Sequence, residues 1–270
     1  VSLILTGGIV ITMDASHRIL TPGAVAIEGS GIAAVGSPAE IAAGYRVYAP
    51  LPPDPNERPL CCGRTFLAVG LVEEARREMQ RTLDALAPYV RRGIPVVGLE
   101  PSCLLTFRDE LPAMFKGEAA ELLAANAQLF EEFIAHEHKQ GQLNLPLGPL
   151  PKKALLHGHC HQKAFDAMSA VESTLRLIPQ LSVETIESSC CGMAGSFGYH
   201  VDTIEVSQKM GELSLLPAVR KAPADALIVA DGTSCRHQIF DGSKREAAHV
   251  ARVLAMSVAA AGSTADMSSY

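Results

Sequence analysis

Short apolar runs alternate with longer stretches of helical periodicity along most of this chain. Apolar residues recur at helical spacing over residues 69–90, and residues 107–140, 163–177 and 201–220 are also typical of helices. Apolar runs bounded by proline, glycine or turn residues predict buried strands at 94–99, 154–156, 182–187 and 226–230. A last helix is predicted over about 244–260, with a frayed tail at 262–270. Strands that alternate with helices predict an α/β protein with parallel sheets.

The first 36 residues have a different pattern. Short β-rich runs at 3–6, 9–13, 25–28 and 32–36 are separated by glycine pairs and an Asp-Ala-Ser turn, which predicts β-hairpins. Ser37 and Pro38 are typical of a helix start. Five prolines between positions 50 and 59 then predict an extended linker, so this β-rich segment precedes the α/β region.

Cysteines follow three of the predicted strands. Cys160 comes after the strand at 154–156, the pair Cys190-Cys191 after 182–187, and Cys235 after 226–230. Because ligand sites of open α/β sheets lie at the carboxyl ends of the strands, these four thiols are expected to converge. Thiolates are ligands for soft metals. Glycines that let the backbone approach a bound centre and donate N–H groups to sulfur follow the pair, at Gly192, Gly195 and Gly198.

A weaker copy of the pair, Cys61-Cys62-Gly63, indicates an internal repeat. The order Cys-Cys-Gly, helix, break, strand, Ser-Cys describes both 61–103 and 190–235. We therefore predict two Rossmann-like units related by duplication and preceded by the small β-rich segment. The first unit has only Cys61, Cys62 and Cys103 and is one ligand short. The predicted domains are 1–44, 45–150 for the truncated first unit with a helical insertion, 151–261 for the second unit, and 262–270 for a disordered tail.

Each candidate site residue also has a structural interpretation. The cysteines could be buried free thiols, although the glycine pattern then has no purpose. On an extended segment, His157, His159 and His161 would share one face and Cys160 the other, which allows a His/Cys site. We favour Cys160 as the ligand, with histidines placed around the centre. The residues predicted to surround the centre are Gly192, Gly195, Gly198, His159, His161 and His237.

Three charged residues near the cysteines have roles that the sequence leaves open. Lys163 and Arg236 could offset thiolate charge or lie on a solvated surface. Glu100 occupies a ligand-like position three residues before Cys103. It could coordinate zinc, but capping a loop is the favoured interpretation.

Composition and charge exclude several functions. The net charge is −6 with no basic block, so nucleic acid is not an expected partner. No apolar run reaches the length of a membrane span, and the N-terminus lacks the pattern of a signal peptide. Seven cysteines, two pairs of them vicinal, do not resemble an extracellular disulfide framework. We expect a cytoplasmic protein, or one peripheral at the inner face of the membrane.

Residues 2–44 resemble the first segment of the amidohydrolase superfamily, especially its deaminase-like members. The likeness lies in Gly-Gly-Ile-Val-Ile-Thr-Met-Asp at 7–14 and Gly-Ala-Val-Ala-Ile-Glu at 23–28. It implies a small β-sandwich. The His-x-His strand that holds the metal of that family does not follow, so the resemblance brings no catalytic residue, and hydrolase activity is not expected.

Residues 45–255 resemble the cysteine-rich (Cys-Cys-Gly) domains of iron–sulfur oxidoreductases, closest to the C-terminal module of FAD-linked D-lactate and glycolate dehydrogenases. Two cysteines of the family pattern are replaced here, by Glu100 and Gly232. The motifs that carry the resemblance are PLCCGR (59–64), GLEPSC (98–103), HGHCHQK (157–163), SCCGMAGSFG (189–198) and DGTSCRHQ (231–238).

The resemblance implies an electron-transfer module with a [4Fe–4S]-type cluster held by Cys160, Cys190, Cys191 and Cys235. The cluster would receive electrons from FAD on a partner flavoprotein or missing domain, and pass them to a quinone or another acceptor. Substrate oxidation by this chain alone is not expected. A zinc-stabilised interaction domain without a redox role is the alternative.

Overall fold

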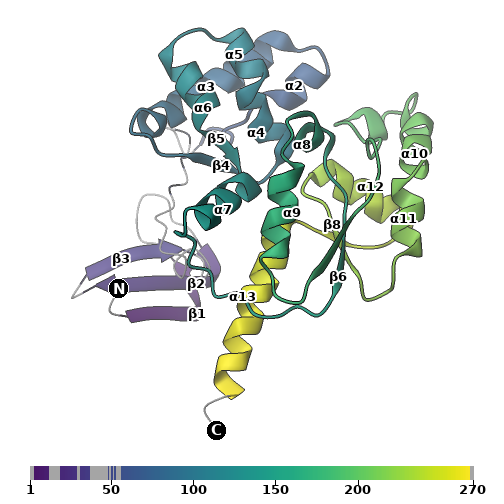
Figure 1. Ribbon diagram of the computed structural model, residues 1–270. Helices are drawn as coiled ribbons and strands as arrows, with labels where there is room; N and C mark the ends of the chain where they lie inside the picture. The colour runs from purple at the N-terminus through teal and green to yellow at the C-terminus, as the bar shows by residue number, and fades with distance from the viewer. Residues whose placement is uncertain are drawn as a thin grey trace.

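The computed structural model describes residues 3–11, 19–28, 31–36, 48, 50, 52 and 56–267, and side chains from position 48 to 261 within these ranges (Figure 1). The strands are β1 (Leu3–Ile11), β2 (Ile19–Glu28), β3 (Gly31–Gly36), β4 (Val96–Gly98), β5 (Ala127–Leu129), β6 (Lys153–Leu156), β7 (Ser182–Thr185), β8 (Leu227–Val229) and β9 (Ala247–Ala248). The helices are α2 (Arg64–Ala68), α3 (Val72–Val90), α4 (Pro101–Arg108), α5 (Glu110–Met114), α6 (Glu118–Asn126), α7 (Phe130–Lys139), α8 (Cys160–Ala164), α9 (Met168–Arg176), α10 (Ile204–Glu212), α11 (Leu215–Lys221), α12 (Thr233–Ser243) and α13 (Val250–Met267), with a 3₁₀ turn at Phe197–Tyr199.

The C-terminal unit is built on a four-stranded parallel sheet in the order β7-β6-β8-β9. Successive residues of a strand point to opposite faces. Leu156 and Val229 pack with α9 and α13 on one face, and Leu155 and Ile228 pack with α11 and α12 on the other. Figure 1 shows these helix pairs on opposite sides of the sheet. The predicted α/β class with parallel strands is therefore confirmed.

The order of the strands reverses between β6 and β8. The chain moves from β6 to β7 on one side, then crosses back to β8 and continues outward to β9. In open α/β sheets such a reversal leaves a crevice at the carboxyl ends of the two strands, because their connecting helices lie on opposite faces. The loops that follow β6 and β8 therefore face one another across this position.

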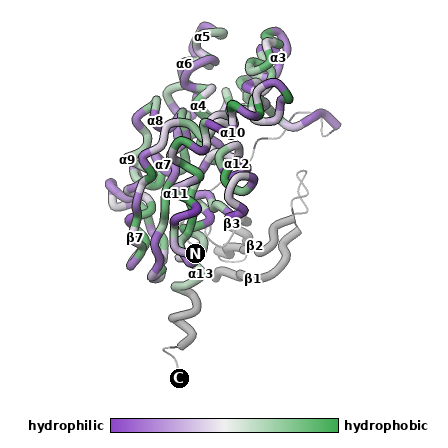
Figure 2. The backbone as a smooth tube through the Cα atoms, turned by 90° about the vertical axis from the view of Figure 1, so that its right-hand side faces the viewer, coloured by the Kyte–Doolittle hydropathy of each residue, from purple (hydrophilic) through white to green (hydrophobic). Residues whose placement is uncertain are grey.

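The N-terminal half of the described α/β region has a smaller sheet. Strands β4 and β5 pair in parallel, and α3, α4 and α6 surround a core that includes Met79, Leu105 and Leu123. The predicted strand at 94–99 forms, but it is not buried, since Val97 is 40% exposed. Apolar and polar residues alternate along α3 in Figure 2, as expected for a helix with one buried face.

Several predicted boundaries are wrong. The helix predicted from residue 69 is interrupted around Gly70, and α3 begins only at Val72. Val69, Leu71 and Val72 are therefore exposed, and the buried residues of this segment come from the later turns of α3. Strand β5 interrupts the helical run predicted at 107–140. The last helix begins at Val250 rather than near 244, because the chain first forms α12, a left-handed turn at Lys244 and β9.

The β-rich prediction for the N-terminus is confirmed for the described backbone. Strands β1, β2 and β3 form an antiparallel sheet in sequence order. β1 runs through the glycine pair at 7–8 as one strand, with register shifts there, rather than turning. The predicted helix start at Ser37 lies outside the described residues. No helix in the described part of the chain is long and apolar enough to cross a membrane.

A buried cluster of Glu131, Asp231 and His249 joins the two halves. His249 Nε2 lies 2.7 Å from the carbonyl oxygen of Leu99 and 3.9 Å from a carboxyl oxygen of Glu131, both in the first half. Asp231 accepts hydrogen bonds from the Val250 backbone and Gln162. Neither carboxyl oxygen of Glu131 has a hydrogen-bond partner among the described residues. Burial first, and then the charge of Asp231, hold the pKa of Glu131 well above its usual value.

Glu131→Gln is expected to stabilise the protein at neutral and mildly alkaline pH. Above the usual carboxyl pKa of 4.5, the unfolded chain releases this proton while the folded protein keeps it. Folding stability therefore falls by about 1.4 kcal/mol per pH unit until the folded-state pKa is reached. The amide removes this cost, so the thermal midpoint of the variant should exceed that of the parent at pH 8 and match it near pH 4.5.

The exposed residue Glu121 provides the control. Glu121→Gln should change the midpoint equally little at both pH values. A Glu131→Gln midpoint that lies below that of the parent at pH 8 would contradict the account.

Candidate metal centre

The ends of β6, β7 and β8 bring four cysteines together, as the sequence predicts. Cys160 begins α8, Cys190 and Cys191 follow β7, and Cys235 is the third residue of α12. Cys191 and Cys235 are buried, whereas Cys190 is half-buried and Cys160 is exposed. All seven cysteines of the chain are free. The site therefore has a buried side within the unit and an accessible side.

Raised and lowered thiol pKa values alternate along these four cysteines. Hydrogen bonds link the sulfurs in the order Cys160, Cys190, Cys191, Cys235. The thiol of Cys160 above all lowers the pKa of Cys190 to about 2, and that of Cys191 lowers the pKa of Cys235 well below its usual value. The pKa values of the two donors, Cys160 and Cys191, are raised for the same reason. These four sulfurs are suited to binding a cation, which would replace the remaining thiol protons.

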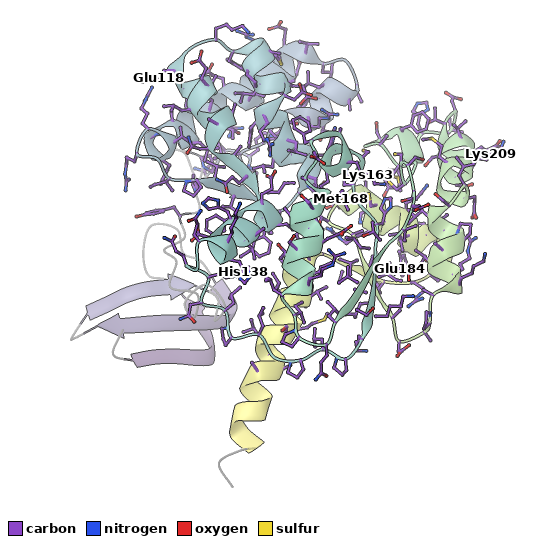
Figure 3. The ribbon with its side chains drawn as sticks, in the orientation of Figure 1. Glu118, His138, Lys163, Met168, Glu184 and Lys209 are labelled. Atoms are coloured by element: carbon purple, nitrogen blue, oxygen red, sulfur yellow. The ribbon has the colours of Figure 1, made fainter. Side chains whose placement is uncertain are left out.

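Backbone N–H groups stabilise negative charge on the cysteine sulfurs, and a lysine holds the loop that carries them. The Gly192 N–H donates to the sulfur of Cys190 at 3.3 Å, and the Met193 N–H favours the thiolate of Cys191. The ammonium of Lys163 donates to the carbonyl oxygens of Ser188 and Ser189, the latter at 2.8 Å. Figure 3 shows Lys163 close to Met168, where α8 leads into α9. Lys163 therefore fixes the loop that precedes the cysteine pair.

Gly192 is required by its surroundings. Its φ is +92°, and a Cβ at this position would lie 2.2 Å from the carbonyl oxygen of Ser207 in α10. The loop thus approaches the helix more closely than any side chain allows. Gly198 is also closely packed, against Met193 and Ser207, whereas Gly195 is exposed. Among the described residues, only Gly192 of the three predicted glycines donates a hydrogen bond to a cysteine sulfur.

The histidines do not share one face, because the extended segment ends at His159 and α8 begins at Cys160. His157 is fully buried, and its ring lies with the sulfurs of Cys191 and Cys235, their ligand atoms within 4.8 Å of one another. His159 caps α8 and accepts a hydrogen bond from the backbone of His161. His159 and His161 therefore lie together beside Cys160, with ring centroids 5.1 Å apart, whereas His157 lies with Cys191 and Cys235.

His161 and His237 lie further from the buried sulfurs. His161 Nε2 is 3.0 Å from a guanidinium nitrogen of Arg64, which belongs to the first half of the molecule. His237 is on the outer surface of α12, where its Nδ1 is 2.9 Å from the hydroxyl of Tyr199. No hydrogen bond joins His237 to a cysteine within the described part of the chain.

Two further residues, which the sequence pattern alone did not single out, hold the loops after β6 and β8 in place. Gln162 accepts from the His159 backbone at 2.9 Å and donates to Asp231 at 2.8 Å. Asp231 in turn accepts from the first residue of α13 at 3.0 Å. The sequence signal that could have indicated their role is their position within the motifs HGHCHQK and DGTSCRHQ, next to the cysteines. A buried, satisfied pair of this kind fixes the distance between two strand ends.

The first cysteine pair has the same local geometry. The Gly63 N–H donates to Cys61 sulfur at 3.4 Å, and a Cβ on Gly63 would lie 2.7 Å from the carbonyl oxygen of Ala75 in α3. The thiol of Cys62 lowers the pKa of Cys103 through a hydrogen bond, and the pKa of Cys62 is raised. Three thiols therefore converge here, with Cys103 exposed.

Glu100 is engaged elsewhere. Its Oε2 accepts from both the backbone N–H and the hydroxyl of Thr233, each at 2.8 Å, and Oε1 accepts from Ser102. Thr233 is the first residue of α12, so Glu100 caps the helix that carries Cys235. Burial alone would raise the pKa of Glu100, but these hydrogen bonds together hold it below its usual value. The capping interpretation is thus supported over zinc coordination.

Comparisons with known proteins identify the domain that contains the second site, the one formed by Cys160, Cys190, Cys191 and Cys235. Residues 154–240 match the family of cysteine-rich domains with the Cys-Cys-Gly motif. The chain therefore contains a cysteine-rich domain of this family, formed by β6 to α12. No solved structure matches the chain.

The similarity to known proteins extends beyond that domain. The chain is 29% identical over 200 residues to a subunit of the anaerobic glycerol-3-phosphate dehydrogenase of Escherichia coli K12, covering 74% of this chain and 50% of the relative. It is 27% identical to D-2-hydroxyglutarate dehydrogenase of the same organism, over 70% of this chain and 17% of the relative. It is 28% identical to lactate utilization protein A of Bacillus licheniformis, over 65% of this chain and 72% of the relative. The chain thus spans only half the length of its glycerol-3-phosphate dehydrogenase relative.

Gly192→Ala is expected to disrupt the site. The added Cβ would lie 2.2 Å from the Ser207 carbonyl oxygen, and the left-handed backbone at this position is unfavourable for alanine. Either α10 or the cysteine loop must therefore move. Left-handed strain alone costs roughly 1–2 kcal/mol for a residue with a Cβ. The midpoint temperature of thermal unfolding and the metal content of the purified protein should both fall markedly.

Gly195→Ala is the matched control. Gly195 also has a positive φ, +64°, but a Cβ there meets only Ala68, at 4.0 Å. This variant should lose no more than the left-handed strain and should keep its metal. Equal effects of the two substitutions would show that close packing at Gly192 is not what constrains the loop.

Glu100→Ala should destabilise the protein by about 0.5–2 kcal/mol at neutral pH, the usual value of a helix cap. Because the pKa of Glu100 is lowered by folding, this contribution is present above the usual carboxyl pKa of 4.5 and disappears as the pH falls through the folded-state pKa. Chemical denaturation at several pH values measures it.

Ser102→Ala removes only the hydrogen bond to Oε1 and leaves both bonds to Thr233. It should have the smaller effect. If Ser102→Ala costs as much as Glu100→Ala, the cap across the two halves is not the source of the stability.

Proposed function

We propose that this chain is the iron–sulfur electron-transfer module of a FAD-linked 2-hydroxyacid dehydrogenase system, of the D-lactate or glycolate type. The observation that carries the proposal is the convergence of Cys160, Cys190, Cys191 and Cys235 where the strand order of the sheet reverses. A [4Fe–4S]-type cluster bound there would accept and release single electrons. The names of the relatives, which include dehydrogenases and a lactate utilization protein, support this class of function.

The donor set fits an anionic sulfur-ligated centre better than a set of inert thiols. Inert buried cysteines are ordinarily protonated and surrounded by apolar groups. Here Cys190 and Cys235 have lowered pKa values, and a backbone N–H bonds to Cys190 sulfur. Hydrogen bonds to sulfur and the degree of burial are the means by which proteins set the potential of such a cluster.

The accessible side of the site suits electron exchange. Cys160 is exposed and Cys190 half-buried, whereas Cys191 and Cys235 are buried. Electrons from FAD on a partner flavoprotein or flavin domain would enter or leave on this side, and a quinone or another acceptor would receive them. Seven free cysteines with two vicinal pairs are suited to a reducing compartment, which supports a cytoplasmic location.

We also infer that the two halves are duplicated units. In each half, the glycine of a Cys-Cys-Gly loop donates its N–H to a cysteine sulfur and packs closely against a helix carbonyl. In each half, a parallel strand also leads into a helix whose third residue is cysteine. The first site has three convergent thiols, and Glu100 is directed away from them. Its role would be to support the second site rather than to hold a complete cluster.

Metal analysis of anaerobically purified protein tests the function. Iron with acid-labile sulfide, and a brown visible spectrum, is the expected result. Cys191→Ser should abolish the chromophore because Cys191 is buried between two other sulfurs, while Cys103→Ser should retain it.

Circular dichroism of each variant serves as the folding control. A colourless protein with one zinc ion would overturn the electron-transfer function and favour a zinc-stabilised domain. Loss of the chromophore in Cys103→Ser, with Cys191→Ser unaffected, would place the centre at the first cysteine pair instead.

A further inference from the structure

His157 occupies the position in the sheet where strand order reverses. It follows directly after β6, and its backbone N–H donates to the Val229 carbonyl of β8 at 2.8 Å, which continues the pairing of the two strands. Its side chain is fully buried. The orientation of the ring is thus determined by the sheet and by the packing around it, rather than by a loop.

The two ring nitrogens of His157 have different surroundings. Nδ1 lies 2.8 Å from the hydroxyl of Ser188, just before the cysteine pair. Nε2 is buried and has no oxygen or nitrogen partner among the described residues, and the His157 ring is within hydrogen-bonding reach of the Cys235 sulfur. A ring nitrogen of His157 lies within 4.8 Å of the sulfurs of Cys191 and Cys235, and Nε2 is the nitrogen that Ser188 leaves available there. A buried polar atom that lacks an oxygen or nitrogen partner is unfavourable, so a ligand at this atom is favoured.

Hydrogen bonding distinguishes His157 from its neighbour His159. Nδ1 of His159 accepts from the backbone N–H of His161 at 3.2 Å, which leaves the proton of a neutral ring on Nε2. In that tautomer Nε2 of His159 is a hydrogen-bond donor and has no lone pair for a metal. Nδ1 of His157 faces the hydroxyl of Ser188, which accepts a hydrogen bond from the Nδ1–H when it donates its own hydrogen to the Ile186 carbonyl, 3.5 Å away. In that arrangement the Nε2 lone pair of His157 is directed at the two sulfurs.

A nitrogen lone pair that faces two sulfurs is stabilised when a cation lies between them. Metal-bound histidines have this pattern, with one nitrogen on the metal and the other N–H on an oxygen that fixes the tautomer. We propose that His157 binds the metal centre of the second site through Nε2, which gives a donor set of four sulfurs and one nitrogen. This assignment rests on the proposed function.

The replacement of a cysteine at position 232 supports the mixed donor set. A Cβ on Gly232 would lie 3.2 Å from Cys235 sulfur, but only 2.3 Å from the His159 ring. The His159 ring therefore occupies the space that a cysteine at 232 would need. A fifth donor would come from another element. Nε2 of His157 and Nδ1 of His161 are buried ring nitrogens without an oxygen or nitrogen partner, and of the two rings His157 is the one grouped with the buried sulfurs of Cys191 and Cys235.

Pulsed electron paramagnetic resonance on the full chain tests the assignment. Anaerobic protein is grown with natural or ¹⁵N-labelled histidine, and its centre is brought to a paramagnetic state. A strong nitrogen hyperfine coupling that changes with the histidine isotope is the expected result. Weak couplings alone, of the size given by N–H···S contacts, would overturn the assignment, and no variant is needed for this comparison.

Variants then identify which histidine is responsible. His157→Gln should eliminate the strong coupling, whereas His159→Gln and His161→Gln should retain it. Ser188→Ala, which removes the partner of Nδ1, should weaken metal retention against a chelator by roughly 10–100-fold. Retention of the strong coupling in a folded His157→Gln protein would exclude His157.

The outcome is separable from that of the proposed function. If the purified protein contains zinc and no iron, the electron-transfer function fails. The Co²⁺-substituted protein, which is paramagnetic, then tests His157 by the same isotope comparison. If iron and sulfide are present without a strong histidine coupling, the function stands and the assignment of His157 fails.

Discussion

The reversal of strand order between β6 and β8 determines where chemistry can occur in this protein. Parallel strands end at one edge of the sheet, and at the reversal their connecting helices leave on opposite faces. The loops after β6, β7 and β8 each contribute cysteine to that edge. Gln162 and Asp231 hold two of these loops together through buried hydrogen bonds. The four thiols converge because the strands are in this order.

The two halves of the α/β region depend on one another at the same place. Glu100 from the first half caps α12, which carries Cys235, and Arg64 lies against His161 next to Cys160. His249 and Leu99 provide a third contact. The first half therefore shapes the helices that position the second site. This explains how a unit with three convergent thiols contributes to function without a complete ligand set.

Much of the site could be predicted from the sequence, because cysteine and glycine at strand ends carry a distinct signal. The convergence of Cys160, Cys190, Cys191 and Cys235 and the capping role favoured for Glu100 both agree with the structure. The grouping of His159 and His161 with Cys160, away from His157, could not be predicted, since it depends on α8 beginning at Cys160. Strand β5 was missed because its three residues lie between two helices and form a strand only through pairing with β4. Exposure of Val97 follows from the small size of that sheet, which the apolar run at 94–99 does not reveal.

We propose that the four thiols at this edge hold a cluster of several metal ions rather than a single ion or none. X-ray absorption at the metal edge, on the whole chain purified without oxygen, measures this directly. We expect an iron edge, a first shell dominated by sulfur, and a second shell of metal–metal scattering that disappears in Cys191→Ser. A zinc edge with sulfur ligands and no metal neighbour would contradict it.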